Sequence, residues 1–244
     1  SFQKFIKFFK PGHVVIENVP GLLSRNDSPL TLFLKFLDSA GYSYNYSVVN
    51  AQEFGVPQTR RRFVLIASRV TEDIDLLKPQ HKPKVRVKDF IGKKNGIPRL
   101  NAGMKDEKDP LHVSAGLSDI NIKRMKLTPK SGGTRLSWKK YKSLQLKTYI
   151  GRDDSFRDVY GRMCWDKPAP TITTKFFSIS NGRFGHPSEN RAISLREGAC
   201  LQTFPKSYKF FTTSIASTAR LIGNAVPPKL AYYIGKSITE MSCV

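Results

Sequence analysis

Short apolar runs separated by polar residues define the first 70 positions of the chain. Apolar residues recur at helical spacing in residues 2–9 and 30–37, which predicts two helices. Residues 13–16, 42–49 and 63–67 are β-branched or alternating runs that predict three short strands. A strand, helix, strand, turn and strand in this order indicate part of an α/β sheet, in which functional groups lie just beyond the strand ends.

The pattern changes after residue 70. From 71 to 190 the apolar runs are short, Lys, Gly, Pro and Ser are frequent, and only residues 169–179 predict a strand. We expect a second, irregular and basic module in this segment. Residues 218–244 return to a turn followed by a helix, and the apolar face of that helix carries Leu230, Ile234, Ile238 and Met241.

The charge balance indicates the kind of partner. The 244 residues include 41 Lys plus Arg against 19 Asp plus Glu, and the formal net charge of +22 calls for a polyanion. Nucleic acid is the first interpretation, and an anionic membrane surface is the weaker one. No run approaches the roughly 20 apolar residues of a membrane-spanning helix, and the N-terminus does not resemble a signal peptide.

Cysteine and histidine usage narrows the chemistry further. The three cysteines form no CxxC pair and no disulfide framework, which favours a reducing compartment. The four histidines lack metal-ligand spacing, so we expect no metal site.

Two polar stretches adjoin the predicted strands. Glu17 follows the first strand, either as a loop acid that caps the next turn or as a pocket acid that shares a proton with a heterocycle. Arg60 and Arg62 lead into the third strand, and alternation sends them to one face and Arg61 to the other. With Gln58 they form either a fork for a phosphate or base oxygen, or a solvated basic turn.

Two further stretches lie towards the end of the chain. Ser194 followed by Glu197 has capping-box spacing, which predicts the start of a helix. The segment 223–228, Gly-Asn-Ala-Val-Pro-Pro, has the chemistry of a tight turn that approaches a ligand closely. Each of these stretches alone is compatible with a purely structural role.

In this order and spacing, the four stretches resemble motifs of the DNA cytosine-5 methyltransferase family. Glu17-Asn-Val is similar to the sixth motif of that family, and Gln58-x-Arg-x-Arg62 is similar to the eighth. Residues 191–205 resemble the ninth motif and residues 223–228 the tenth. The segment between the eighth and ninth motifs resembles a bacterial target-recognition region.

The resemblance implies an α/β fold and a division into two domains. Residues 1–70 and 219–244 would be parts of an incomplete Rossmann-like, S-adenosylmethionine-dependent methyltransferase domain. Residues 71–218, which include the helix of the ninth motif, would form a smaller, irregular, mostly β target-recognition domain.

The resemblance also implies a reaction. Members of the family flip a cytosine out of double-stranded DNA, add a cysteine thiolate to C6 and methylate C5 from S-adenosyl-L-methionine. Glu17 would bind the N3 and N4 edge of the flipped base, Arg62 would hold its O2 oxygen, and Arg60 would support the same site. Asn224 and Ala225 would line the methionine end of the cofactor pocket.

The resemblance and the basic residues together suggest DNA contacts. The expected DNA-binding residues are Gln58, Thr171 and Arg183. Further basic residues with the reach for a base edge or a phosphate are Arg135, Arg157, Arg162 and Lys175. The target sequence is not readable from this set.

The chain also departs from the family pattern. It contains no Pro-Cys dipeptide, because Cys164, Cys200 and Cys243 follow other residues, and it has no Phe-x-Gly-x-Gly cofactor loop. We therefore expect either one subunit of a split enzyme or a C-terminal fragment of a single-chain enzyme. In both cases the chain alone would transfer no methyl group, and an N-terminal methyltransferase half that carries the Pro-Cys nucleophile would be its partner.

Three functions remain possible at this stage. The first is the C-terminal part of a DNA (cytosine-5)-methyltransferase in a bacterial restriction–modification system, located in the cytoplasm and associated with the nucleoid. The alternative is a non-catalytic, sequence-specific DNA-binding or regulatory module derived from a methyltransferase. An RNA-directed enzyme of the same fold is the third, which the long basic recognition region disfavours.

Overall fold

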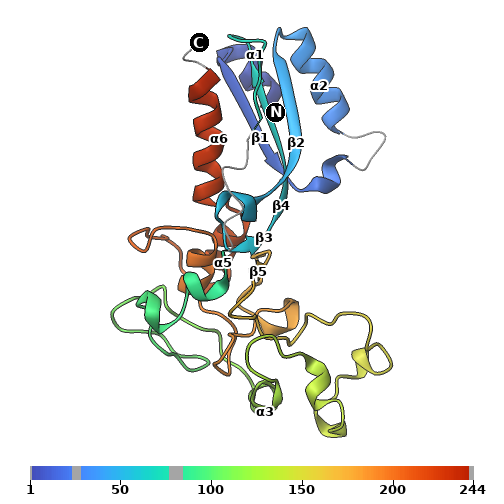
Figure 1. Ribbon diagram of the computed structural model, residues 1–244, viewed down its shortest axis with the longest axis vertical. Helices are drawn as coiled ribbons and strands as arrows, with labels where there is room; N and C mark the ends of the chain where they lie inside the picture. Colours follow the sequence, from blue (N-terminus) through green and yellow to red (C-terminus); the bar gives the residue numbers. More distant parts are fainter. Residues whose placement is uncertain (1, 24–28, 77–84, 242–244) are drawn as a thin grey trace. The chain divides into compact units, whose positions relative to one another are not determined.

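The computed structural model describes residues 2–23, 29–76 and 85–241. Within it the chain forms two compact units (Figure 1). The first unit comprises Ser1–Gly55, Arg60–Pro83 and Pro228–Val244, and the second comprises Val56–Thr59 and Lys84–Pro227. The chain therefore passes between the units four times, at 55/56, 59/60, 83/84 and 227/228, whereas the sequence analysis divided it at 70/71 and 218/219.

A three-stranded sheet forms the centre of the first unit. Its strands are β1 (His13–Asn18), β2 (Ser43–Asn50) and β4 (Arg61–Ser68), in the order β1-β4-β2, with both outer strands antiparallel to β4. Residues 63–67 of β4 have no exposed surface, because the strand is flanked on both edges and covered on its faces. The predicted run of continuous apolar residues is thus the fully buried stretch of the central strand.

Three helices complete the first unit: α1 (Phe2–Phe9), α2 (Pro29–Ser39) and α6 (Pro228–Met241). The strands lie between α2 and α6 in Figure 1. One core cluster joins Ile6 of α1 and Leu37 of α2 to Phe63, Leu65 and Ala67, which alternate along one face of β4. The helices and strands predicted for the first 70 residues are confirmed, as is the C-terminal helix.

Turns and short 3-10 helices dominate the second unit. Its regular elements are β3 (Gln58–Thr59), which pairs in parallel with β5 (Ala169–Pro170), and the helices α3 (Asp119–Leu127), α4 (Leu195–Leu201) and α5 (Ile215–Asn224). The 3-10 helices of the two units cover Pro20–Leu23, Ala51–Phe54, Val87–Asp89, Lys93–Asn95, Arg135–Trp138, Lys142–Leu144, Lys147–Tyr149 and Ile179–Asn181.

The strand predicted at 169–179 was mostly wrong, because β5 ends at Pro170. Proline has no N–H to continue a ladder. Beyond it, contacts to β3 run through side chains: Thr171 Oγ1 donates to the Thr59 carbonyl at 2.6 Å, and the Ile172 amide donates to Gln58 Oε1 at 3.0 Å.

The second unit is irregular, as predicted, but it is not mostly β, because its described part has only β3, β5 and isolated bridges as β structure. Buried arginines satisfy much of its backbone instead. Arg162, 1% exposed, donates to the carbonyls of Thr128 and His186 at 2.9 Å each and of Met125 at 2.6 Å. Arg135 donates to three further carbonyls. In this unit, guanidinium N–H groups donate to backbone carbonyls that would be bonded to a neighbouring strand in a sheet.

Candidate functional site

Antiparallel pairing brings the predicted acid and one of the predicted arginines together in the first unit. Glu17 lies directly opposite Val64, so both side chains are on one face of the sheet. Arg62 lies two residues before Val64 and shares that face, which makes it a diagonal neighbour of Glu17. Arg62 Nε is 2.9 Å from Glu17 Oε1.

This ion pair is close but incompletely bonded. The side chains of Arg62 and Glu17 are only 13% and 16% exposed. Glu17 Oε1 is buried, yet the approach of Arg62 Nε is not directed along an N–H bond, and the oxygen has no hydrogen-bond partner among the described residues. Buried carboxylate oxygens almost always accept hydrogen bonds. The geometry therefore leaves an acceptor ready for a donor from outside the chain.

Arg60 adds a second cation to this face. Its side chain is buried, whereas Arg61 is exposed on the opposite face, as alternation predicted. Burial lowers the pKa of Arg60 to about 10; repulsion from Arg62 lowers it further, and attraction to Glu17 acts in the opposite direction. Arg60 still carries its proton at neutral pH, so two cations accompany one carboxylate and suit an electron-rich oxygen.

Asn50 holds the start of β4 in place. Its Oδ1 accepts from the Gln52 amide at 3.3 Å and from the Arg60 amide at 3.2 Å. The Ala51 amide in turn donates to the Arg60 carbonyl at 2.8 Å. Sequence analysis did not single out Asn50, although its position as a polar residue at the end of a predicted strand is a signal of this kind.

Gln58 lies in the second unit, where its amide is fully used. The side chain has no exposed surface, and its Nε2 donates to the Leu201 carbonyl at 2.9 Å and to Gln202 Oε1 at 2.8 Å. Its Oε1 accepts from the Ile172 amide. Gln202 extends the network, donating to the Ile222 carbonyl at 2.6 Å. Gln58 thus joins β3 to α4 and α5, and its side chain is out of reach of DNA.

The other predicted DNA contacts are placed as follows. Thr171 is half-buried, and its hydroxyl donates to the Thr59 carbonyl of β3. Arg183 is partly exposed, and donates to Asp158 Oδ1 at 2.8 Å and to the Gly132 carbonyl at 3.0 Å. Arg135 and Arg162 are buried supports of the backbone, so their interpretation as base or phosphate contacts was wrong. Their bonds span long sequence separations, which no local pattern reveals.

The ninth-motif helix α4 is anchored by a closed ion pair in the second unit. The predicted capping box of Ser194 and Glu197 is present. Arg191 donates to both Glu197 oxygens, at 2.7 and 2.9 Å, and both side chains are essentially without exposure. Burial opposes ionisation of Glu197, but Arg191, helped by His186, outweighs it and holds the pKa of Glu197 well below its usual 4.5. This pair is structural.

Asn224 and Ala225, the predicted cofactor contacts, lie at the end of α5. Gly223 and Asn224 are the last helical residues there, so the predicted tight turn was wrong. A Cβ on Gly223 would lie 2.5 Å from the Thr173 carbonyl group, which shows that this glycine permits close packing against protein backbone. The Asn224 carboxamide is exposed and makes no hydrogen bond with any described residue, so it fits a polar end of a cofactor.

Among the described cysteines, neither has the setting of an activated nucleophile. Burial raises the pKa of Cys200 to about 11, which keeps it a thiol at neutral pH. Cys164 is half-buried and accepts a weak hydrogen bond from Ser131 at 3.6 Å. Cys243 lies outside the described residues. Within the described ranges there is no group of three His, Cys, Asp or Glu side chains placed for a metal ion. No helix in those ranges has the length and apolarity needed to cross a bilayer.

Comparisons with known proteins agree with this arrangement of motifs. Residues 1–240 match the family model of C-5 cytosine-specific DNA methylases. The chain is 39% identical to the type II methylase M.HgiDII of Herpetosiphon aurantiacus, over 98% of this chain and 67% of that protein. It is 30% identical to the type II methyltransferase M1.BsuMI of Bacillus subtilis, over 95% of this chain and 52% of that protein. The chain thus spans about half to two thirds of these relatives.

Solved structures share the fold. A DNA modification methyltransferase encoded within an E. coli prophage aligns with all of this chain and 73% of its own, with a TM-score of 0.70 and 20% identity. The Dnmt2 methyltransferase of S. pombe aligns with 94% of this chain and 67% of its own, with a TM-score of 0.55 and 16% identity. These likenesses extend to the α/β methyltransferase fold, and the match to the family model covers nearly every residue. The chain belongs to the C-5 cytosine-specific DNA methylase family.

Proposed function

We propose that this chain supplies the cytosine-binding and DNA-recognition part of a DNA (cytosine-5)-methyltransferase of the restriction–modification type. The observation that carries the proposal is the Glu17–Arg62 pair, with its unbonded buried carboxylate oxygen. A pure DNA-binding module needs cations but has no need of a desolvated acid beside them. The type II methyltransferases among its relatives support the same assignment.

Glu17 and the arginines would bind the two ends of the Watson–Crick edge of one flipped cytosine. The free Glu17 oxygen accepts from the N4 amino group, and the carboxyl group holds a proton at N3. Arg62 donates to the O2 oxygen, where negative charge accumulates when a thiolate adds to C6. Arg60 stabilises that charge from the same face of the sheet. Together these groups would stabilise the cytosine ring after a thiolate has added to C6. In that state C5 is nucleophilic.

Asn224 and Ala225 would contribute to the pocket for S-adenosyl-L-methionine. When bound, the cofactor supplies the methyl group that C5 accepts. The exposed carboxamide of Asn224 can donate to and accept from the amino acid end of the cofactor. The close packing of Gly223 on Thr173 fixes the end of α5 and so the direction of that carboxamide.

The nucleophile would come from outside this sequence. No Pro-Cys dipeptide occurs in it, and the raised pKa of Cys200 disfavours a substitute role for that thiol. Its source would be either a separate N-terminal subunit or an N-terminal segment of the same polypeptide. The net positive charge of the chain would hold the double-stranded DNA substrate. The segment 60–99 contributes to this charge, because it contains 12 Lys plus Arg and 4 Asp plus Glu.

Reconstitution tests the proposal. The chain is mixed with an N-terminal methyltransferase half that carries the Pro-Cys motif, and the transfer of labelled methyl groups to duplex DNA is measured. We expect no transfer by the chain alone and transfer by the mixture. In the mixture, Glu17→Gln and Arg62→Ala should each lower turnover by about 10²- to 10⁴-fold, with DNA retention nearly unchanged.

Two neighbouring residues provide controls. Arg61→Ala removes an exposed arginine from the opposite face, and Glu72→Gln removes an exposed carboxylate of the same unit. Both variants should keep turnover within about twofold of the parent. Methyl transfer by the isolated chain would contradict the missing nucleophile. Parallel loss of DNA retention and turnover in Glu17→Gln would favour the non-catalytic DNA-binding module.

A further inference from the structure

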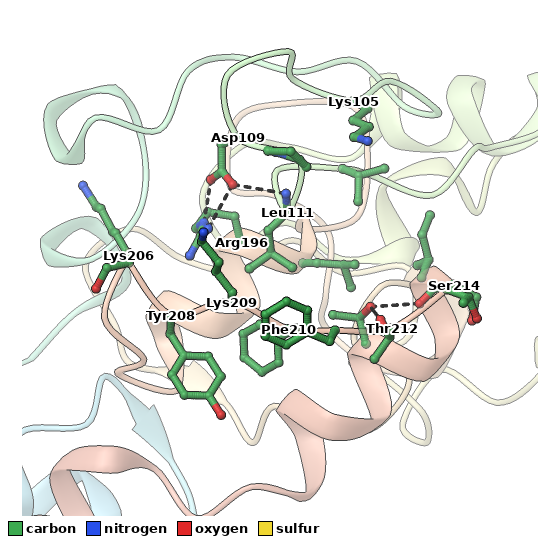
Figure 2. A pocket seen from close by; sticks show the side chains of 18 of the residues that line it. Lys105, Asp109, Leu111, Arg196, Lys206, Tyr208, Lys209, Phe210, Thr212 and Ser214 are labelled. Atoms are coloured by element: carbon green, nitrogen blue, oxygen red, sulfur yellow. Dashed lines mark hydrogen bonds and ion pairs between the residues drawn. The ribbon is translucent and has the colours of Figure 1, made fainter.

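A cavity of about 810 Å³ lies within the second unit, and the cytosine site makes no use of it. Its wall combines residues 105–113, the start of α4 and the segment 206–218 that leads into α5. Figure 2 shows Asp109 and Arg196 on one side of it, Thr212 and Ser214 on the other, and the Phe210 ring between them. Its size is that of a small-molecule or nucleotide site.

The cavity wall is strongly cationic. Its charged side chains are five cations and a single carboxylate: Lys105, Lys108, Arg196, Lys206, Lys209 and Asp109. The carboxylate is already engaged, since Asp109 accepts from Arg196 at 2.5 and 2.9 Å. The exposed Lys105, Lys108 and Lys209 have no ion-pair partner among the described residues. An anionic ligand is therefore expected.

Two groups in the wall offer unused donors. Arg196 is 8% exposed, and its Nη1 is buried without a hydrogen-bond partner in the described part of the chain. Helix α5 also begins here: Ser214 caps the Ser217 amide, while the amides of Ile215 and Ala216 precede the first intrahelical bond. A helix N-terminus attracts phosphate oxygens.

Aromatic rings border the same cations. Phe211 is 90% exposed and Tyr208 is 48% exposed, although both rings are large and apolar. Tyr208 is held by its neighbours, with its ring centroid 4.8 Å from that of Phe210 and 4.9 Å from that of Phe204. Cations beside exposed aromatic rings are the combination that binds single-stranded nucleic acid, because unpaired bases stack on the rings while phosphates meet the cations.

We propose that this cavity binds one or two nucleotides of an unpaired DNA strand, with phosphates at Lys105, Lys108 and Lys209 and a base against Phe211 and Tyr208. A duplex cannot use these rings, since its bases are already stacked. An adjoining cavity of about 670 Å³ shares the Asp109–Arg196 wall but adds two carboxylates, Asp106 and Glu107, against one cation, Arg99, so the phosphates favour the side of Lys209. The site goes beyond the proposed methyl transfer and does not depend on it.

The test measures binding of a fluorescent octathymidylate to the whole chain by anisotropy at several salt concentrations. Phe211→Ala should weaken binding about tenfold, as expected for the loss of one stacked base. Lys108→Ala/Lys209→Ala should weaken it by a similar factor and reduce the slope of log affinity against log salt by about 1.4. All of these side chains are exposed, and unchanged thermal melting would confirm that the variants remain folded.

Matched variants separate the site from overall charge. Phe8→Ala removes a phenylalanine that is 80% exposed in the first unit, and Lys123→Ala/Lys126→Ala removes two exposed lysines from α3. Neither should change octathymidylate binding by more than about twofold. Equal losses in the cavity and control variants would overturn the proposal, as would unchanged binding by Phe211→Ala.

Two further arms identify the ligand. Thymidine monophosphate should compete at least tenfold more weakly than the octamer; equal competition would overturn the assignment to a strand. Blunt duplex DNA should bind Phe211→Ala as well as the parent. Glu17→Gln should leave octathymidylate binding unchanged whatever its effect on methyl transfer, so the failure of one proposal is distinguishable from the failure of the other.

Discussion

Two arginine–glutamate pairs, one in each unit, show how the same side chains serve different purposes. In the second unit, Arg191 meets both oxygens of Glu197, and the Ser194 amide donates to Glu197 Oε2 at 2.7 Å. In the first unit, Arg62 approaches one oxygen of Glu17 without a directed hydrogen bond. That oxygen accepts no hydrogen bond from any residue in the described ranges.

The difference lies in how completely each carboxylate is satisfied. Arg191 and the Ser194 amide satisfy both oxygens of Glu197, and His186 lies beside them: its Nδ1 accepts from the Glu189 amide at 2.9 Å, and its Nε2 is 3.4 Å from Glu197 Oε1 without a directed hydrogen bond. A buried pair with every acceptor assigned stabilises a helix start but offers nothing to a ligand. A buried acid with an open oxygen contributes less to folding and is available for chemistry.

Removing the closed pair is expected to have the largest effect. Glu197→Ala leaves the buried Arg191 guanidinium with Glu189 as its carboxylate partner and removes the acceptor of the Ser194 amide from the capping box, so the free energy of unfolding should fall by about 3–5 kcal/mol. Urea unfolding followed by circular dichroism measures this loss. Glu240→Ala, which breaks the exposed Lys236–Glu240 pair, is the control and should cost about 0.3–0.5 kcal/mol. A loss below 1 kcal/mol in Glu197→Ala would show that the two pairs do not differ in this way.

The pH dependence of stability should follow the same pair. The pKa of Glu197 in the folded chain lies well below 4.5, its ordinary value. A depressed carboxyl pKa contributes stability that is fully present above the unfolded value and is lost as pH falls from about 4.5 towards the folded pKa. The loss proceeds at up to about 1.4 kcal/mol per pH unit.

Urea midpoints between pH 7 and pH 3 provide the measurement. The parent chain should lose stability steeply below pH 4.5, while Glu197→Gln should start lower and show a shallower decline. If the stability of the parent and of Glu197→Gln declined in parallel as the pH falls, Glu197 would not be the source of the acid sensitivity.

The first unit was predictable because its signals are local. Periodicity located its helices and strands, and strand alternation placed Arg60 and Arg62 on one face, away from Arg61. The meeting of Glu17 with Arg62 needed one more fact, the antiparallel register of β1 and β4, which the motifs suggested only as adjacent strand ends.

The second unit was not predictable in this way, because long-range polar bonds define it. Gln58 and Gln202 are 144 residues apart, and Arg162 reaches acceptors 24 to 37 residues away. Such bonds leave no hydrophobic period in the sequence. A run such as 169–179 therefore resembles a strand, although side-chain bonds take over after Pro170.

The uncharged Gln58–Gln202 network tests whether the large contribution expected of the Arg191–Glu197 pair to stability comes from its burial or from its charge. Gln202→Leu removes one of the two acceptors of Gln58 Nε2 and the side-chain donor to the Ile222 carbonyl, and should lower the free energy of unfolding by about 1–3 kcal/mol. Gln58→Leu should cost a similar amount. The double variant should cost less than the sum, because both remove the same bond.

Urea unfolding of the four proteins in this cycle measures the coupling. Gln52→Leu, which changes a partly exposed amide in the first unit, should cost less than about 0.5 kcal/mol. Strictly additive losses would show that the two amides support the fold independently.

The smallest effect on folding is expected at the open pair. Glu17→Gln removes the attraction of Glu17 for Arg62 and Arg60, which destabilises the first unit, but it also removes a buried carboxylate oxygen that lacks a hydrogen bond, which stabilises it. Because these terms oppose each other, the free energy of unfolding should change by less than about 1 kcal/mol. Urea unfolding alongside Glu197→Gln measures the contrast between isosteric substitutions. A loss above 3 kcal/mol would mark Glu17 as a structural anchor like Glu197, and the argument that its open oxygen is kept for a base would fail.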